Sequence, residues 1–174
     1  MPLVDVKRTY LEMRSLDALS GSQEDPAGES LVELRPCSLE DARRLYRAVG
    51  ERYHWRDRLV QADDELRAYL ARDDVRVFVA RSDGREDGYF ELLRQENGEV
   101  EVAYFGLMEH AHGRGIGRWL LVRAVQVAFA WGSTRVWLHT CTLDSPAALP
   151  NYLARGFVAF REEWYQAQLD EWTR

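Results

Sequence analysis

Lysine, cysteine and long apolar runs are all scarce in this chain of 174 residues. Lys7 is the one lysine among 23 cationic residues, and the arginines are scattered along the chain. A nucleic-acid-binding surface needs clustered basic residues, so the sequence disfavours that class of protein. No apolar run approaches the ~18 residues of a membrane-spanning helix, and the charged first 20 residues do not resemble a signal peptide. We therefore expect a cytoplasmic protein with no nucleic-acid and no membrane partner.

The two cysteines and the charge balance further restrict the class of protein. Cys37 and Cys141 match no metal or disulfide framework, which indicates small core residues in a reducing compartment. The 29 acidic residues give a net charge of −6, which slightly favours a cationic partner such as an amine. With 46% hydrophobic residues the chain can fill one core. We expect one domain over 31–174, preceded by an N-terminal strand and a flexible linker over 1–30.

Hydrophobic periodicity predicts an α+β fold with a mixed, mostly antiparallel central sheet flanked by helices. An extra strand, from Val4 to Met13, is expected at a sheet edge. The other predicted strands are Leu31–Arg35, Val75–Arg81, Gly88–Arg94, Glu99–Leu107, Val136–Thr140 and one starting at Phe157. Predicted helices are Leu39–Val49, Asp63–Arg72, Gly115–Trp131 and one between Ser145 and Gly156. The Asp83-Gly84 and Asn97-Gly98 turns predict antiparallel hairpins.

A glycine-rich segment, HAHGRGIGR over 110–118, separates a predicted strand from the strongest predicted helix. Backbone amides at the start of a helix bind phosphate groups, and glycines let a ligand approach the backbone closely. A tight turn with positive φ angles explains the glycines equally well, and the spacing leaves both readings open. The segment lacks the Lys of a Walker loop, and its position does not suit a dinucleotide fingerprint. His110 and His112 lack the further ligands that a metal site requires.

Two motifs in this order resemble the GNAT superfamily of N-acetyltransferases. His112–Gly117, HGRGIG, is similar to the family's acetyl-CoA loop, Arg/Gln-x-x-Gly-x-Gly/Ala, with a histidine at the first position. Tyr152–Phe157, YLARGF, is similar to the family's Tyr-x-x-x-Gly-Phe. The resemblance covers Leu31 to Tyr165. It implies a GNAT-like fold and acetyl-CoA as co-substrate.

The resemblance also implies an activity and its binding residues. The expected reaction moves an acetyl group from acetyl-CoA directly to a primary amine of a small molecule, with no metal and no covalent enzyme intermediate. Tyr53, His54 and Trp55 lie in the loop that lines the acceptor pocket in this family. The residues implied in acetyl-CoA binding are Leu107, His112, Gly113, Arg114, Gly115, Ile116, Gly117 and Ser145.

Two catalytic roles follow from the same resemblance. A glutamate base eleven positions before the loop motif falls on Glu101, with Glu99 and Glu91 as reserve candidates, and Tyr152 resembles the tyrosine that protonates the leaving thiolate. Strand alternation is expected to place Glu99, Glu101, Ala103 and Phe105 on one face, and Val100, Val102 and Tyr104 on the other. Each carboxylate is equally explained as a solvated group on an open sheet face. His139 is more typical of a sheet-face histidine than of a second base.

Two other functions remain open at this point. A non-catalytic acyl-CoA sensor would keep the loop and lack acceptor chemistry. A protein or peptide acetyltransferase would need an open acceptor cleft. The N-terminal strand and Gln166–Arg174 could pair with a second chain as a homodimer or cover the chain's own sheet edge.

Overall fold

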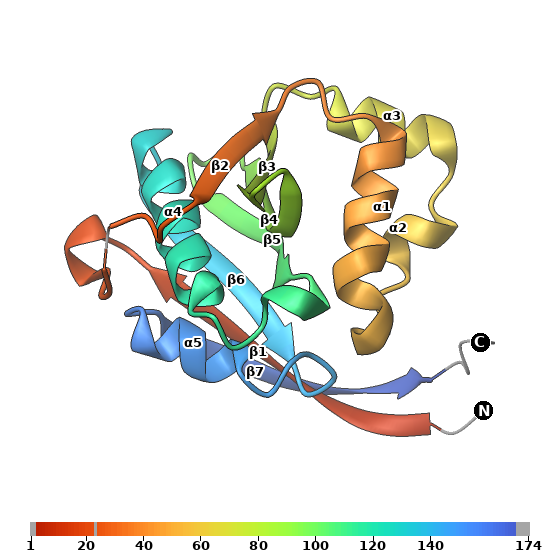
Figure 1. The fold of residues 1–174 in the computed structure, drawn as a ribbon. Coiled ribbons are helices and arrows are strands. Elements are labelled where there is room, and N and C mark those ends of the chain that lie inside the picture. The colour runs from red at the N-terminus through yellow and green to blue at the C-terminus, as the bar shows by residue number, and fades with distance from the viewer. Residues whose placement is uncertain (1–2, 23, 170–174) are drawn as a thin grey trace.

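The computed structural model describes residues 3–22 and 24–169, and these form a sheet with helices on both faces (Figure 1). Within them the strand order is β2-β3-β4-β5-β6-β1-β7. This mixed sheet flanked by helices confirms the predicted fold class. The strands are β1 (Leu3–Met13), β2 (Glu29–Leu34), β3 (Val75–Ser82), β4 (Arg85–Arg94), β5 (Val100–Leu107), β6 (Val136–Cys141) and β7 (Val158–Gln168).

Helices divide between the two faces of the sheet. The long helix α4 packs against β4 and β5 and contributes seven of the 20 buried residues of one core cluster. On the other side, α1 and α3 contribute Leu45, Val49 and Leu66 to a second cluster. The helices are α1 (Leu39–Gly50), α2 (Asp57–Val60), α3 (Asp63–Leu70), α4 (Ile116–Ala130) and α5 (Ala148–Ala154). None of the helices in the described part of the chain is long and apolar enough to cross a membrane.

The predicted turns and the first helix cap form as expected. The β3–β4 hairpin turns at Asp83 and Gly84, both at positive φ, and the β4–β5 hairpin turns at Gly98, with φ of 80°. Positive φ is the conformation that two-residue hairpin turns require. At the start of α1, the Ser38 hydroxyl accepts a hydrogen bond from the Asp41 amide at 3.0 Å.

A fork in the sheet creates the space for a site. The parallel strands β5 and β6 pair only at Val100 with Val136 and at Glu101 with Trp137. Beyond these pairs β5 continues to Leu107 and β6 to Cys141 without a shared ladder. The backbone groups and side chains on the two facing strand ends are therefore available to a ligand.

The N-terminal strand lies inside the sheet, so its predicted position at an edge is wrong. β1 pairs antiparallel with β6, from Arg8 opposite Cys141 to Met13 opposite Val136, and with β7 on its other side. Alternation of apolar residues reports which face of a strand is buried, but it does not report how many neighbours the strand has. The end of β7, up to Gln168, pairs with β1, and residues 170–174 lie outside the described residues.

A β-bulge at Ala103 corrects the predicted faces of β5. Glu91 pairs with Tyr104 and Leu92 with Val102, which leaves Ala103 without an opposite residue. An extra residue shifts the alternation by one position. Phe105 therefore packs in the α4 core together with Val100 and Val102, while Tyr104 turns to the face covered by α1. The predicted alternation holds up to Ala103 and is wrong beyond it.

Candidate active site

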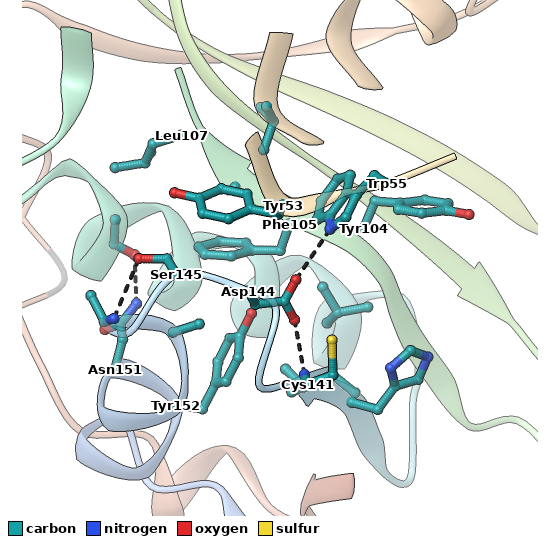
Figure 2. Close-up of a pocket in the computed structure, with 18 of the residues that line it drawn as sticks. Tyr53, Trp55, Tyr104, Phe105, Leu107, Cys141, Asp144, Ser145, Asn151 and Tyr152 are labelled. Atoms are coloured by element: carbon teal, nitrogen blue, oxygen red, sulfur yellow. Dashed lines mark hydrogen bonds between the residues drawn. The ribbon is translucent and has the colours of Figure 1, made fainter. Parts of the chain in front are cut away.

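A cavity of about 830 Å³ opens where β5 and β6 diverge. Its walls include the end of β5, the glycine-rich loop before α4, the segment from β6 to α5 and the loop before α2, and residues of α1, β1 and β7 add to them. Figure 2 shows part of this lining, including Leu107, Asp144, Tyr152 and Trp55. Two of the predicted motifs and the predicted acceptor loop thus meet around one space.

The glycine-rich loop forms one end of this cavity. His112, Gly113, Gly115 and Gly117 line it. Gly113 and Gly115 have φ angles of 76° and 79°, and a Cβ atom at either would meet nothing within 4 Å. The glycines therefore serve a tight turn and also leave the backbone open to a ligand. Gly115 is the N-cap of α4 and has no side chain, so the first N–H groups of the helix are left to a ligand.

Two residues of the loop motif turn away from the cavity. Ile116 is buried in the α4 core. The Arg114 guanidinium lies 3.9 Å from Glu29 and 3.8 Å from Asp87, both buried beneath the loop. These two residues therefore fix the shape of the loop from below, and only its glycines and His112 face the ligand side.

A buried acid completes the support under the loop. Burial alone would raise the pKa of Asp87, but hydrogen bonds from Ser82 and His110 hold that pKa below its usual value. His110 Nε2 lies 2.7 Å from Asp87.

In the part of the chain that the structure describes, no group of three or more His, Cys, Asp or Glu side chains is arranged to hold a metal ion.

Tyr152, Leu107 and Ser145 line the cavity as neighbours of the loop. Tyr152 comes from α5, and its ring lies edge-on to Phe105 with 6.1 Å between ring centroids. Burial, and next the Asp144 carboxylate, raise the pKa of the Tyr152 hydroxyl well above its usual value. The hydroxyl is therefore protonated at neutral pH.

The acceptor loop crosses the cavity and is tied to its far wall. Tyr53 and Trp55 line the cavity, whereas His54 does not. The Trp55 Nε1–H donates to Asp144 at 3.1 Å, and Asp144 also accepts from the Cys141 amide at 2.9 Å (Figure 2). The Thr140 hydroxyl donates to the same carboxylate at 2.7 Å. We call this hydrogen-bonded link between Trp55 and Asp144 the Trp55–Asp144 strap. It joins the loop before α2 to the segment after β6.

Gly50 sets the position of Trp55, which leads to a first prediction. A Cβ atom at Gly50 would lie 2.5 Å from three atoms of Trp55. Alanine normally favours a helix over glycine, but here we expect Gly50→Ala to lower the free energy of unfolding by about 1–3 kcal/mol because the indole must move. Urea unfolding and tryptophan fluorescence would measure the loss and the displacement. A more stable variant with unchanged fluorescence would contradict this packing.

The three candidate carboxylates occupy different positions. Glu101 is not among the residues that line the cavity; burial, and then the Glu91 charge, raise its pKa. Glu91 is buried and bonded to Arg58 at 2.5 Å and to the Tyr69 hydroxyl at 2.6 Å. Glu99 is paired with Arg135 at 2.9 Å. Glu91 and Glu99 therefore hold structural partners, and the base role of Glu101 stays a prediction.

The cavity wall also contains residues that the sequence did not single out as functional. His139 and Cys141 of β6 and Arg8 of β1 line it. His139 is exposed toward the cavity, and partial desolvation there, and then the Arg8 charge, lower its pKa, which favours a neutral imidazole at neutral pH. Burial and the Asp144 charge raise the pKa of Cys141, so the thiol stays protonated. Cys37 is a core residue as predicted, but Cys141 faces the cavity.

A family comparison agrees with this geometry. The family model described as "Acetyltransferase (GNAT) family" matches residues 36–157, which is more than half of the chain. The chain belongs to the GNAT acetyltransferase family. Strand β1, which supplies Arg8, lies outside the matched region.

The similarity to individual proteins either covers a small part of the chain or has low sequence identity. An uncharacterized N-acetyltransferase of Mycobacterium tuberculosis is 38% identical over 56 residues, which is 32% of this chain and 36% of that protein. A GCN5-related N-acetyltransferase from Kribbella flavida has a TM-score of 0.63 at 22% identity, covering 90% of this chain and 56% of the other. An aminoglycoside acetyltransferase from an uncultured soil sample, solved with trehalose, has a TM-score of 0.60 at 18% identity, covering 74% and 87%. At these identities the two structures show the shared fold alone.

Proposed function

We propose that this chain transfers an acetyl group from acetyl-CoA to the amine of a small molecule. The observation that carries this proposal is one continuous cavity that joins the glycine-rich loop, the fork between β5 and β6, and an aromatic wall. A cofactor, its reacting group and an acceptor need three adjoining subsites. The family membership supports acetyl transfer as the reaction class.

The residues at the loop end fit acetyl-CoA. The backbone at Gly113 and Gly115 is open, and the N–H groups at the start of α4 suit a pyrophosphate. Asn151 Oδ1 and Arg155 Nε are buried, line the same end and have no hydrogen-bond partner among the described residues. Arg118 adds a positive charge there. We assign the phosphates to this loop with Arg118 and Arg155, and the pantetheine arm to the unpaired end of β5 up to Leu107.

The side chains at the fork supply the acid and base of the reaction. Acetyl-CoA supplies an activated acyl carbon in its thioester. His139 accepts a proton from the ammonium of the acceptor, which has a pKa near ~10.4 when unperturbed. The resulting amine forms the new C–N bond as the C–S bond breaks, and Tyr152 donates its hydroxyl proton to the departing sulfur. The new amide nitrogen loses its second proton to water, and this proton restores the Tyr152 hydroxyl.

The Trp55–Asp144 strap supports a small acceptor over a protein one. The strap spans the acceptor side of the cavity, and the aromatic rings of Tyr46, Trp55 and Tyr104 lie within 5.2–5.5 Å of one another beside it. Such a wall suits a compact, partly apolar molecule that fills the space. An extended peptide would need the strap to open.

Replacing Gly115 by valine tests the proposal at the loop. Valine is strained at φ of 79° and places a side chain where the cofactor approaches, so we expect about 100-fold weaker acetyl-CoA binding by calorimetry. Gly98→Val is the matched control, because Gly98 has φ of 80° and equally open space but lies in the β4–β5 turn. The control should keep the wild-type affinity.

The wild-type protein and the two variants are then screened for acetylation of small amines by acetyl-CoA. Turnover of small amines supports the proposal, and Lys7 is the one lysine available for self-acetylation. Acetyl-CoA binding without turnover of any amine would favour the acyl-CoA sensor. If wild-type protein binds no acetyl-CoA, or if Gly115→Val binds it as well as Gly98→Val, the assigned loop is wrong.

A further inference from the structure

The acceptor wall carries a cation that comes from outside the family domain. Arg8 lies on β1, opposite Cys141 of β6, and lines the cavity. Tyr10 and His139 form the next pair on the same face, and their rings lie 5.5 Å apart. Arg8 and His139 are therefore diagonal neighbours in an antiparallel pair, with about 7–8 Å between their Cα atoms. The long Arg8 side chain can reach a molecule that touches His139.

Neighbouring groups fix the Arg8 guanidinium without using all of its donors. Nη1 donates to Glu163 at 3.1 Å, and the guanidinium lies 4.7 Å from the centre of the Tyr165 ring. The Nε atom is buried and has no hydrogen-bond partner among the described residues. A guanidinium held in place with a donor to spare is suited to bind a carboxylate.

The local charge balance is positive beside Arg8. Glu163 also accepts from Arg161 at 2.6 Å, so this one carboxylate is shared between two guanidinium groups. Asp57 also lines the cavity, and its charge acts on the His139 imidazole. Asp144 lines the cavity too, but three protein donors already bind it. The acceptor subsite thus offers a negative group and a positive group that both act on the proposed base.

We propose that the acceptor is an amino acid, a zwitterion whose carboxylate binds Arg8 and whose amine lies at His139 beside Asp57. This inference rests on the proposed function and names its substrate class. The aromatic wall formed by Tyr46, Tyr53, Trp55 and Tyr104 suits an aromatic side chain on that amino acid. Substrate choice would then depend on β1, a strand that the family model does not include.

A matched pair of acceptors isolates the carboxylate. L-Phenylalanine and phenethylamine differ only in that group, so the ratio of their kcat/KM values reports its binding. We expect the wild-type enzyme to favour L-phenylalanine by at least about tenfold, and Arg8→Gln to lower this ratio about tenfold to a hundredfold. Arg8→Lys, which keeps the charge but loses the planar fork, should give an intermediate ratio.

Arg161→Gln is the control variant. It removes a guanidinium that binds the same Glu163 and stacks on Tyr10 at 4.8 Å, yet Arg161 does not line the cavity. Its ratio should stay within about threefold of the wild type. A ratio that falls equally in Arg161→Gln and Arg8→Gln would mean that the loss is structural, and it would overturn the carboxylate site.

A binding measurement separates this inference from the proposed function. Calorimetry with CoA-saturated protein should show tighter binding of L-phenylalanine than of phenethylamine, and Arg8→Gln should abolish the difference. If this preference is present but neither these compounds nor any amine of the screen is acetylated, the proposed function fails and the carboxylate site stands. If both are acetylated without preference for L-phenylalanine, the proposed function stands and the amino-acid inference is overturned.

Discussion

A His139→Gln variant should lose about 100-fold or more in kcat/KM for any acceptor amine. Removing a positioned general base typically costs 10²–10⁴-fold, and glutamine keeps a polar side chain of similar reach without the titration. His139 lines the acceptor side of the cavity, next to the fork from which the thioester would be approached. Steady-state kinetics with saturating acetyl-CoA would measure the loss, and acetyl-CoA calorimetry would show that the cofactor end is intact.

The pH dependence gives a second signature of the same base. Desolvation and then the Arg8 charge lower the pKa of His139 below 6.5, against smaller opposing effects of the Asp144, Glu163 and Asp57 charges. The imidazole accepts protons only when neutral, so kcat/KM should rise with pH through a pKa below 6.5. His139→Gln should lack this acidic limb.

Glu101→Gln is the comparison that decides between the two candidate bases. Burial raises the pKa of Glu101, so a rate that depended on it would rise through a limb above the usual carboxylate range. We expect His139→Gln to show the larger loss. If Glu101→Gln loses more, and His139→Gln keeps the acidic limb, the base is Glu101 and the role of His139 is wrong.

Local patterns account for the parts of the fold that sequence could predict. The meander follows from alternating strands and from turns such as Asp83-Gly84, whose conformation depends on those two residues alone. Likewise, the closely spaced Gly113 and Gly115 predict a tight loop whose backbone is open to a ligand, as the structure has it. The fold class and the glycine-rich end of the cavity could therefore be predicted.

The acceptor side depends on tertiary pairing that local patterns do not encode. The place of β1 between β6 and β7 brings Arg8 to the cavity, although 133 positions separate it from Cys141. The bulge at Ala103 turns Tyr104 toward the acceptor, and periodicity assumes a regular strand. His139 is the one residue of the acceptor side that a local pattern points to. Leu138 and Thr140 are buried, and His139 and Cys141 alternate with them, so these two side chains lie on the other face of β6 at its end.

Glu91→Ala should be the most destabilising single change considered for this protein. The Arg58–Glu91 pair is almost fully buried, with side chains 7% and 3% exposed. The Arg58 guanidinium also lies between the rings of Tyr69 and Tyr104, 4.6 and 4.8 Å from their centres. Removing Glu91 would leave a buried cation without its counter-charge, which typically costs about 3–5 kcal/mol of unfolding free energy.

Two comparisons make the Glu91 prediction specific to the buried charge. Glu33→Ala breaks the Arg76–Glu33 pair, which has side chains 21% and 26% exposed, and should cost about 1 kcal/mol or less in urea unfolding. The double variant Arg58→Met/Glu91→Leu removes both buried charges and should recover most of the stability that Glu91→Ala loses.

Because Arg58 stacks on Tyr104, a wall of the acceptor subsite, Glu91→Ala should also raise KM for the amine more than Kd for acetyl-CoA. A Glu91→Ala loss no larger than that of Glu33→Ala would show that the buried pair does not anchor this wall.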